Sequence, residues 1–372
     1  MASGGAIVFL SLPLLVGLFM ENHGMAEAEA WVIASAYFST YLLASASSVL
    51  WVNRLSCKLL GGLAYGLMAF GLALAAVAAG ISLLTVGMCI AGVGGGMLFS
   101  LGVGIIAAGP DTDRNYGWLL VAQQLVAAAF LLFVPTLVVP VWDLGGALLS
   151  LALLAILFSP SLHLVGSIRL GSTSGGGENP VQVLPRVRVL FALGALVVHF
   201  AGLSSLWAFV ERIGEANGLA NAEVGQALSL SMLGGLAGAL AVTQLGNRIG
   251  RQLPLWLSTL AFAAVTIAYG LPLKWASYFL ITALLSFAWN FVLAYQMSIV
   301  SDLGNGEAGA VLIPAAQGLG AVIGPVMGGA ILGGLGQTAL LASVGLICVG
   351  TIVVFSTLAR GVERQNLVSP GT

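Results

Sequence analysis

Two titratable side chains could carry a proton in apolar surroundings. His199 is the only histidine inside a predicted membrane span, and its reference pKa of about 6.5 suits uptake and release near neutral pH. Glu211 is the acidic residue nearest to the apolar stretches of the second half, and His199, Leu203, Trp207 and Glu211 recur every four residues. We hypothesise proton transfer at His199 or Glu211. The alternatives are a neutral His199 hydrogen-bonded between helices and a solvated Glu211 paired with Arg212.

Uncharged polar and aromatic side chains also fall near the centres of apolar stretches, where polar groups are costly and usually face an interior or a wet cavity. The candidate substrate-binding residues are Tyr37, Tyr41, Gln123, Gln124, Trp207, Trp289, Asn290 and Gln317. For the amides, hydrogen bonds between helices are an equally good explanation. This set contains no Lys, Arg or Asp, which favours a neutral or weakly charged, partly apolar small molecule over a dianion or phosphate ester.

The composition indicates what kind of molecule positions these residues. Of 372 residues, 59% are hydrophobic and 7% are charged, whereas soluble domains carry about 25% charged residues. A soluble enzyme, a disordered chain and a disulfide scaffold are therefore excluded, and a polytopic membrane protein remains. The net charge of -1 gives no attraction for nucleic acid. The three cysteines are too widely spaced to predict a metal site, and we expect neither a metal nor a cofactor.

Runs without Asp, Glu, Lys or Arg mark the segments that can cross a bilayer, because charged side chains are expensive in lipid. Eight runs have 20 to 28 residues, enough for one span each. Two runs, 59–110 and 308–359, have 52 residues and predict two spans each. Small and polar residues permit their turns near Gly80 and within Gly333–Thr338. The sequence thus predicts twelve transmembrane helices.

The distribution of Lys and Arg predicts the orientation of these spans. Placing the N-terminus in the cytoplasm puts ten of the twelve Lys and Arg residues inside and leaves only Arg212 and Lys274 outside. We therefore expect an inner-membrane protein with both termini in the cytoplasm. The alternative is a cleaved signal peptide over residues 6–30. It is disfavoured because the first basic residue is Arg54.

The two halves of the chain match at a constant offset of 194 residues. Matched pairs include Gly24 with Gly218, Glu29 with Glu223, Asn53-Arg54 with Asn247-Arg248, and Ala122-Gln123 with Ala316-Gln317. A hydrophilic, glycine-rich stretch separates the halves. The predicted domains are a six-helix bundle at 1–160, a cytoplasmic linker at 161–188, a second six-helix bundle at 189–360 and a cytoplasmic tail at 361–372. Two parallel repeats joined in this way suit alternating access.

A family resemblance enters at the loops that follow the second and eighth predicted helices. Leu245-Gly246-Asn247-Arg248-Ile249-Gly250-Arg251 resembles the signature loop of the major facilitator superfamily, roughly G-x-x-x-D-R-x-G-R-R, and 52–58 resembles a degraded copy. The layout and linker are similar to that family over the whole chain. The resemblance implies an all-α polytopic membrane protein with twelve transmembrane helices in two pseudo-symmetric six-helix bundles, the major facilitator fold.

In that family the loop aspartate takes part in a charged latch on the inward side, but both aspartates are asparagines here. The resemblance makes Asn53, Arg54, Asn247, Arg248 and Arg251 the candidate latch residues. An amide forms hydrogen bonds without carrying charge, so we expect a weaker or differently built latch. For Arg54 and Arg248, a role limited to setting the topology is an equal alternative.

Residues 320–329 read G-x-x-x-G-P-x-x-G-G, and drug/proton antiporters of the family carry such a motif on helix 5. Here it lies on predicted helix 11, and predicted helix 4 lacks the membrane arginine of those antiporters, which weakens a drug-efflux interpretation. Gly324 and Pro325 are candidates for a helix bend, because proline removes a backbone donor. Tight helix packing is the alternative.

These observations favour a secondary transporter that works as a monomer on a small-molecule substrate in the lipid bilayer, with protons as a candidate coupling ion. No phosphate-binding loop of the G-x-x-x-x-G-K-[ST] form is present, so the energy source would be a gradient. One alternative is a non-transporting sensor or accessory protein with the same fold. Another is a membrane enzyme, which is disfavoured because His23, His163 and His199 are scattered.

Overall fold

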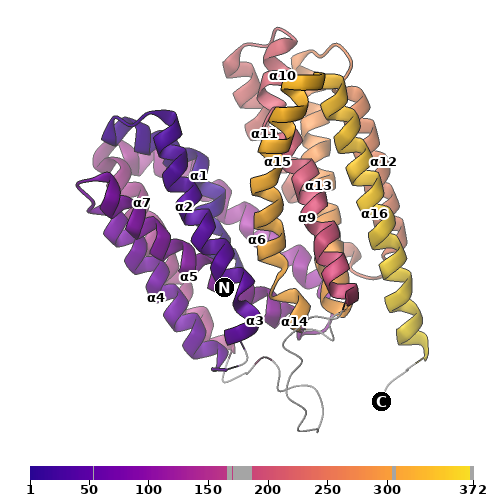
Figure 1. The fold of residues 1–372 in the computed structure, drawn as a ribbon, viewed down its shortest axis with the longest axis horizontal. Coiled ribbons are helices and arrows are strands. Elements are labelled where there is room, and N and C mark those ends of the chain that lie inside the picture. The colour runs from indigo at the N-terminus through magenta and orange to yellow at the C-terminus, as the bar shows by residue number, and fades with distance from the viewer. Residues whose placement is uncertain (53, 166–169, 171–186, 304–306, 369–372) are drawn as a thin grey trace. The chain divides into compact units, whose positions relative to one another are not determined.

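The structure is a computed structural model that describes residues 1–52, 54–165, 170, 187–303 and 307–368, which are almost entirely helical (Figure 1). No strand occurs within these ranges. The first half contains α1 (Ala2–His23), α2 (Glu27–Ala46), α3 (Ser48–Trp51), α4 (Cys57–Ala76), α5 (Ile81–Ala107), α6 (Thr112–Phe133), the π-helical η1 (Val134–Val138), α7 (Val139–Phe158), η2 (Ser159–Ser161) and α8 (Leu162–Val165). The second half contains α9 (Val187–Trp207), α10 (Val210–Ala216), α11 (Asn221–Leu245), α12 (Gln252–Ala268), α13 (Trp275–Leu303), α14 (Glu307–Ala310), α15 (Ile313–Leu335) and α16 (Gln337–Val368).

Each of the twelve predicted spans has its own long helix within the described ranges. They are α1, α2, α4, α5, α6, α7, α9, α11, α12, α13, α15 and α16. Both 52-residue runs divide where the small and polar residues predicted a turn, because α5 begins at Ile81 and α16 begins at Gln337. Gly336, with a φ of 83°, supplies the left-handed backbone of the second turn. Asp143 has non-helical backbone angles and separates the fifth and sixth spans.

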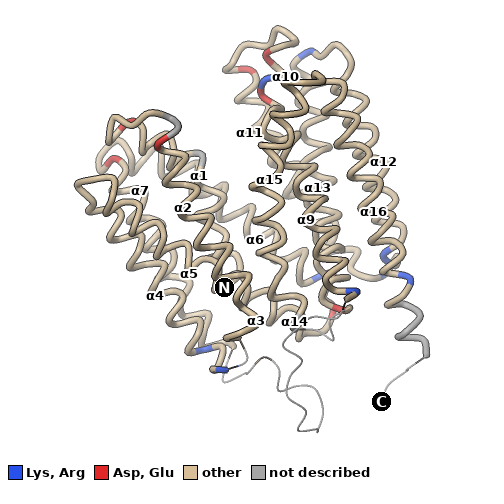
Figure 2. Tube along the Cα trace, viewed as in Figure 1, with Lys and Arg blue, Asp and Glu red and all other residues tan. Residues whose placement is uncertain are grey.

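The helices have the length and polarity of a multi-pass membrane protein. In the described part of the chain, eight segments are long and apolar enough to cross a bilayer, or nine if the bent α1 is one span. One of the eight, Thr112–Val165, contains both α6 and α7. Figure 2 shows Lys, Arg, Asp and Glu mainly at helix ends. Many large apolar side chains are exposed, as lipid-facing helices require.

The chain divides into two compact units. The first contains Met1–Ala108, Ala122–Leu184 and Ala310–Ala315, and the second contains Gly109–Val121, Pro185–Gly309 and Ala316–Thr372. Helix α6 therefore starts in the second unit and continues in the first. The finer predicted bounds of 1–160, 161–188, 189–360 and 361–372 stay a prediction, and 166–169, 171–186 and 369–372 lie outside the described residues.

The 194-residue repeat is visible in the local geometry of each unit. Gly24 and Gly218 both have positive φ values, 61° and 83°. Just beyond each glycine, a helix begins with the same glutamate cap. The carboxylate of Glu29 accepts a hydrogen bond from the Ala26 N–H at 3.0 Å, and that of Glu223 accepts one from the Ala220 N–H at 2.9 Å. Both acids satisfy donors that a helix start would otherwise leave unpaired, so their role here is structural.

Glycines bring the central helices of each unit unusually close together. In the first unit, a Cβ added to Gly92 or Gly96 of α5 would collide with the backbone oxygen of Tyr37 or Tyr41 on α2. In the second unit, a Cβ added to Gly234 or Gly238 of α11 would collide with the backbone of Ala283 or Phe287 on α13. Small residues at such positions let two helix backbones approach within a membrane. The 194-residue offset matches α2 with α11 and α5 with α13. Both halves therefore contain the same close helix pair, but the glycines lie on the second helix of the pair in the first half and on the first helix in the second half.

Candidate functional site

The charged cluster around Arg251 is the most densely bonded polar site among the described residues. Arg251 lies between α11 and α12 and is 5% exposed. Its Nε donates to both carboxylate oxygens of Asp113 at 3.0 Å, and its Nη1 lies 2.6 Å from a carboxylate oxygen of Asp302. Its Nη2 donates to the Ser298 hydroxyl at 2.7 Å. The hydroxyls of Thr112 and Ser298 lie 2.6 Å apart, which completes the cluster within the second unit.

The electrostatics of this cluster follow from one cation between two acids. Burial opposes the charged guanidinium, but the nearby Asp113 and Asp302 outweigh burial and raise the pKa of Arg251 above its usual value. Arginine suits this position because its planar group offers several donors in a fixed arrangement. The side chain of Asp113 is 2% exposed, so it depends on Arg251 for compensation, whereas the side chain of Asp302 is 27% exposed and partly hydrated.

The signature loop supplies the backbone that aims Arg251 inward. Gly246 and Gly250 have φ values of 50° and 65°, which glycine adopts without steric cost. The hydroxyl of Tyr295 donates to the Gly246 carbonyl at 3.0 Å and ties the loop to α13. This backbone conformation explains why the motif has glycine at both positions. Gly246 and Gly250 bend the chain on either side of Asn247 and Arg248.

Of the five predicted latch residues, Arg251 alone is buried in this network. Asn247, Arg248 and Arg54 are exposed, and their side chains form no hydrogen bond or ion pair within the described part of the chain. Asn53 lies outside the described residues. The sequence reasoning missed the partners of Arg251, Asp113 and Asp302. The sequence did contain a usable signal. Both acids lie at predicted helix ends, on the same predicted side of the membrane as the loop that contains Arg251.

His199 is enclosed in the second unit. It is 1% exposed, its Nδ1 lies 2.8 Å from the Thr351 hydroxyl, and the ring of Phe262 stands edge-on at 5.7 Å. The Thr351 hydroxyl also donates to the carbonyl of Ile347 at 2.8 Å, so its oxygen is left to accept from the imidazole. With the Thr351 proton on that carbonyl, neutral His199 would carry its own proton on Nδ1. Its Nε2 is buried without a partner in the described residues and keeps a free lone pair.

Glu211 is not part of the same stripe. Helix α9 ends at Trp207, and Glu211 lies on the separate α10, so the four-residue recurrence is real only for His199, Leu203 and Trp207. Glu211 is exposed, and Arg212 does not form an ion pair with it. Arg212 lies instead over the ring of Phe209, 5.4 Å from its centroid. The predicted pairing of the two charges is therefore absent among the described contacts.

The candidate binding residues of the second unit form an aromatic group between α9 and α13. The ring of Trp289 lies edge-on to Trp207 at 6.3 Å and to Phe200 at 5.6 Å. Trp207 is 37% exposed, and Trp289 is half-buried. Asn290 is half-buried and donates to the Ser286 carbonyl of its own helix at 3.0 Å, so its amide is partly used within α13. These rings present apolar faces with few competing polar groups.

In the first unit, Tyr37 and Tyr41 stack on one face of α2 with ring centroids 6.1 Å apart. Both are buried, and the Tyr37 hydroxyl has no partner within the described ranges. Gln123 on α6 is 8% exposed with an unpartnered Nε2, and Gln124 is half-buried.

Gln317 on α15, which the 194-residue repeat matches to Gln123, is also 8% exposed with an unpartnered Nε2. A buried amide donor without a partner is costly, so each calls for an additional partner such as water or a ligand.

The glycine–proline motif packs α15 against α9. The helix continues through Pro325 from Ile313 to Leu335. A Cβ added to Gly324 would lie 2.6 Å from the Ala201 carbonyl oxygen, and one added to Gly328 would lie 2.9 Å from that of Ser205. These contacts support the close-packing alternative for the motif. A bend at Gly324 and Pro325 stays a prediction.

Comparisons with known proteins identify the architecture. No protein-family model matches the sequence, and a search of curated proteins finds no significant match. The structure is nevertheless similar to the major facilitator superfamily transporter FucP in its outward conformation, with a TM-score of 0.75 and 16% identity over 97% of this chain and 98% of FucP. The chain has the major facilitator fold.

Two further solved structures of this fold have comparable similarity. The human organic anion transporter MFSD10 has a TM-score of 0.73 and 16% identity over 95% of this chain and 96% of that protein. The proton:xylose symporter XylE has a TM-score of 0.69 and 13% identity, covering 95% of this chain and 91% of XylE. The fold prediction of twelve transmembrane helices in two pseudo-symmetric bundles is thereby confirmed, since the similarity extends over nearly the whole chain.

Proposed function

We propose that this chain is a secondary active transporter, not an enzyme, that moves a small, neutral or weakly charged, partly apolar organic molecule by alternating access. The main support is the major facilitator fold over nearly the full chain. Solved structures with this fold include a fucose:proton symporter of E. coli, a proton:xylose symporter and an organic anion transporter. The buried aromatic and amide residues support an uncharged or weakly charged substrate.

His199 is our candidate for proton coupling. Its Thr351 partner leaves Nε2 free to accept a proton, and a buried imidazole can load and release that proton only when water or substrate reaches it. Glu211 stays a second candidate, with the weaker support of an exposed position. Transport in the absence of a pH gradient need not use either residue.

The Arg251 cluster supports a latch that differs from the family pattern. The predicted bundle bounds assign Asp113 to the first bundle and Arg251 to the second, although both residues fall in the same compact unit. Under those predicted bounds, the ion pair would have to break when the bundles separate on this side. In this proposal Asp113, at the first turn of α6, carries the negative charge that Asn247 has lost. The orientation expected from Lys and Arg would put this latch on the cytoplasmic side of an inner membrane.

The transport proposal is tested in proteoliposomes with an imposed pH gradient and a panel of labelled sugars and other small neutral metabolites. We expect the wild type to accumulate at least one of them. His199→Gln should abolish gradient-driven accumulation and retain exchange at equal pH. Glu211→Gln serves as the matched variant at the other candidate. Unchanged accumulation in His199→Gln would remove His199 from coupling.

The alternative is a non-transporting sensor or accessory protein. Tight binding of a compound in a thermal-shift screen, combined with no flux of that compound in liposomes, would favour the sensor over the transporter. We retain it because both aspartates of the family's loop pattern are asparagines in this chain.

A further inference from the structure

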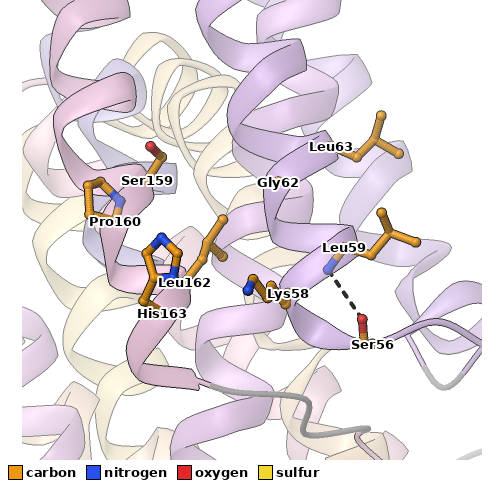
Figure 3. Close-up of a pocket in the computed structure, with 9 residues that line it drawn as sticks. All are labelled: Ser56, Lys58, Leu59, Gly62, Leu63, Ser159, Pro160, Leu162 and His163. Carbon is orange, nitrogen blue, oxygen red and sulfur yellow. Dashed lines mark hydrogen bonds between the residues drawn. The ribbon is translucent and has the colours of Figure 1, made fainter.

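A groove of about 670 Å³ lies in the first unit between the beginning of α4 and the segment where α7 gives way to η2 and α8. Its polar rim is formed by Ser56, Lys58, Ser159 and His163. Figure 3 shows His163 and Pro160 on the α8 side, with Leu59 and Leu63 on the α4 side. Neither the candidate binding residues nor the latch line this groove.

The rim of the groove carries the positive charge of Lys58, and beside it the imidazole of His163, without a matching acid. Lys58 and His163 are exposed, and neither forms an ion pair in the part of the chain that the structure describes. No Asp or Glu is among the residues that line the groove. The hydroxyls of Ser56 and Ser159 add hydrogen-bonding groups beside them. This rim is therefore complementary to an anion that bears several acceptor oxygens.

Beside the rim, the surface of α4 is apolar. Leu59 and Leu63, one turn apart, are 58% and 53% exposed. Gly62 leaves space between them and Leu162, because a Cβ added there would meet only Leu162, at 4.0 Å. One turn further along, a Cβ added to Gly66 would meet nothing within 4 Å. Gly62 and Gly66 thus leave open space along α4, from the rim toward the apolar part of the helix.

We propose that this groove is a binding site for an anionic phospholipid, with the headgroup phosphate at Lys58 and His163 and an acyl chain along Gly62 and Gly66. A soluble anion would use the rim alone, whereas the adjoining apolar path of exposed leucines and absent side chains fits an amphiphile. Basic pockets at helix ends are known to favour lipids of this charge. The lipid is a structural ligand of the first unit, and its binding does not depend on transport.

The test uses the purified full chain in detergent, mixed with phosphatidylglycerol or phosphatidylcholine of identical acyl chains, with retained lipid counted by native mass spectrometry. We expect at least a threefold preference for phosphatidylglycerol in the wild type. Lys58→Gln should reduce that preference at least threefold, and Lys58→Arg should retain it. Gly62→Leu should reduce retention by filling the path. The matched controls are Lys274→Gln, a basic residue before a different helix, and Gly194→Leu, a glycine with open space around it.

Two outcomes would overturn the proposal. One is equal lipid retention by the wild type, Lys58→Gln and Gly62→Leu, each with an unfolding temperature close to the wild type in lipid-free detergent. The other is competition by inorganic phosphate alone at the concentration of phosphatidylglycerol, which would show that a soluble anion occupies the rim. If Gly62→Leu fails to fold, Lys58→Gln against Lys58→Arg decides the question, because both are exposed substitutions.

Discussion

Replacing Arg251 by Gln tests whether the buried charge cluster stabilises the fold. The substitution removes the only cation that contacts Asp113 and Asp302 among the described residues and leaves Asp113 with a 2% exposed side chain. Breaking a buried ion pair by removing one partner costs about 3–5 kcal/mol, because the remaining charge is uncompensated. We expect a loss of that size in the free energy of unfolding.

The assay is reversible unfolding in mixed detergent micelles, monitored by tryptophan fluorescence. The matched control is Arg248→Gln, three residues away in the same loop. Arg248 is exposed without a side-chain partner in the described ranges, so its replacement should change stability by less than about 0.5 kcal/mol. Pairing Arg251→Gln with Asp113→Asn should recover at least about 1 kcal/mol, since the double variant no longer buries an unpaired carboxylate.

The cluster interpretation would be refuted by equal stabilities of Arg251→Gln and Arg248→Gln. It would also be refuted if the double variant lost the full sum of the two single losses, because additivity would mean that Arg251 and Asp113 are not coupled.

Five other substitutions have expected outcomes that the same unfolding assay can check. Gly92→Ala should destabilise by more than about 1 kcal/mol, because its Cβ would meet the α2 backbone, whereas Gly66→Ala, with open space around it, should be nearly neutral or stabilising; equal effects would argue against the close contact. Glu29→Ala and Glu223→Ala should each cost about 0.5–2 kcal/mol and by similar amounts, since the two caps have the same geometry, and a large difference would contradict equivalent roles. Tyr37→Phe should leave stability unchanged or raise it, because the removed hydroxyl has no partner in the described part of the chain, so that a fall in substrate affinity would report a ligand contact.

Much of the architecture could be predicted because the bilayer imposes a simple rule on the sequence. The scarcity of charged residues between helix ends located all twelve spans, and the turn at Gly336 followed from small residues. The repeat predicted equivalent roles for Glu29 and Glu223, which the two matching caps confirm. Such features depend on residues near one another in sequence or on a regular offset.

The partners of individual side chains were harder to predict, because they depend on which faces of distant helices meet. Thr351 lies 152 residues from His199, and Asp113 lies 138 residues from Arg251. The recurrence that placed Glu211 on the stripe of His199 failed because a helix end at Trp207 interrupts it. Periodicity indicates a shared face only while the helix continues.

The glycines of the close helix pair lie on α5 in the first half and on α11, the counterpart of α2, in the second half. This difference matters for chimaeras that combine helices from the two halves. In the first half, glycines on α5 allow the close approach of α2 and α5. In the second half, glycines on α11 allow the close approach of α11 and α13. A chimaera in which α2 packs against α13 would have no glycine at this contact, so side chains would collide. One in which α11 packs against α5 would have glycines on both helices, which would leave a void between them. The two halves therefore share an order of helices but differ in which helix of the close pair carries the glycines.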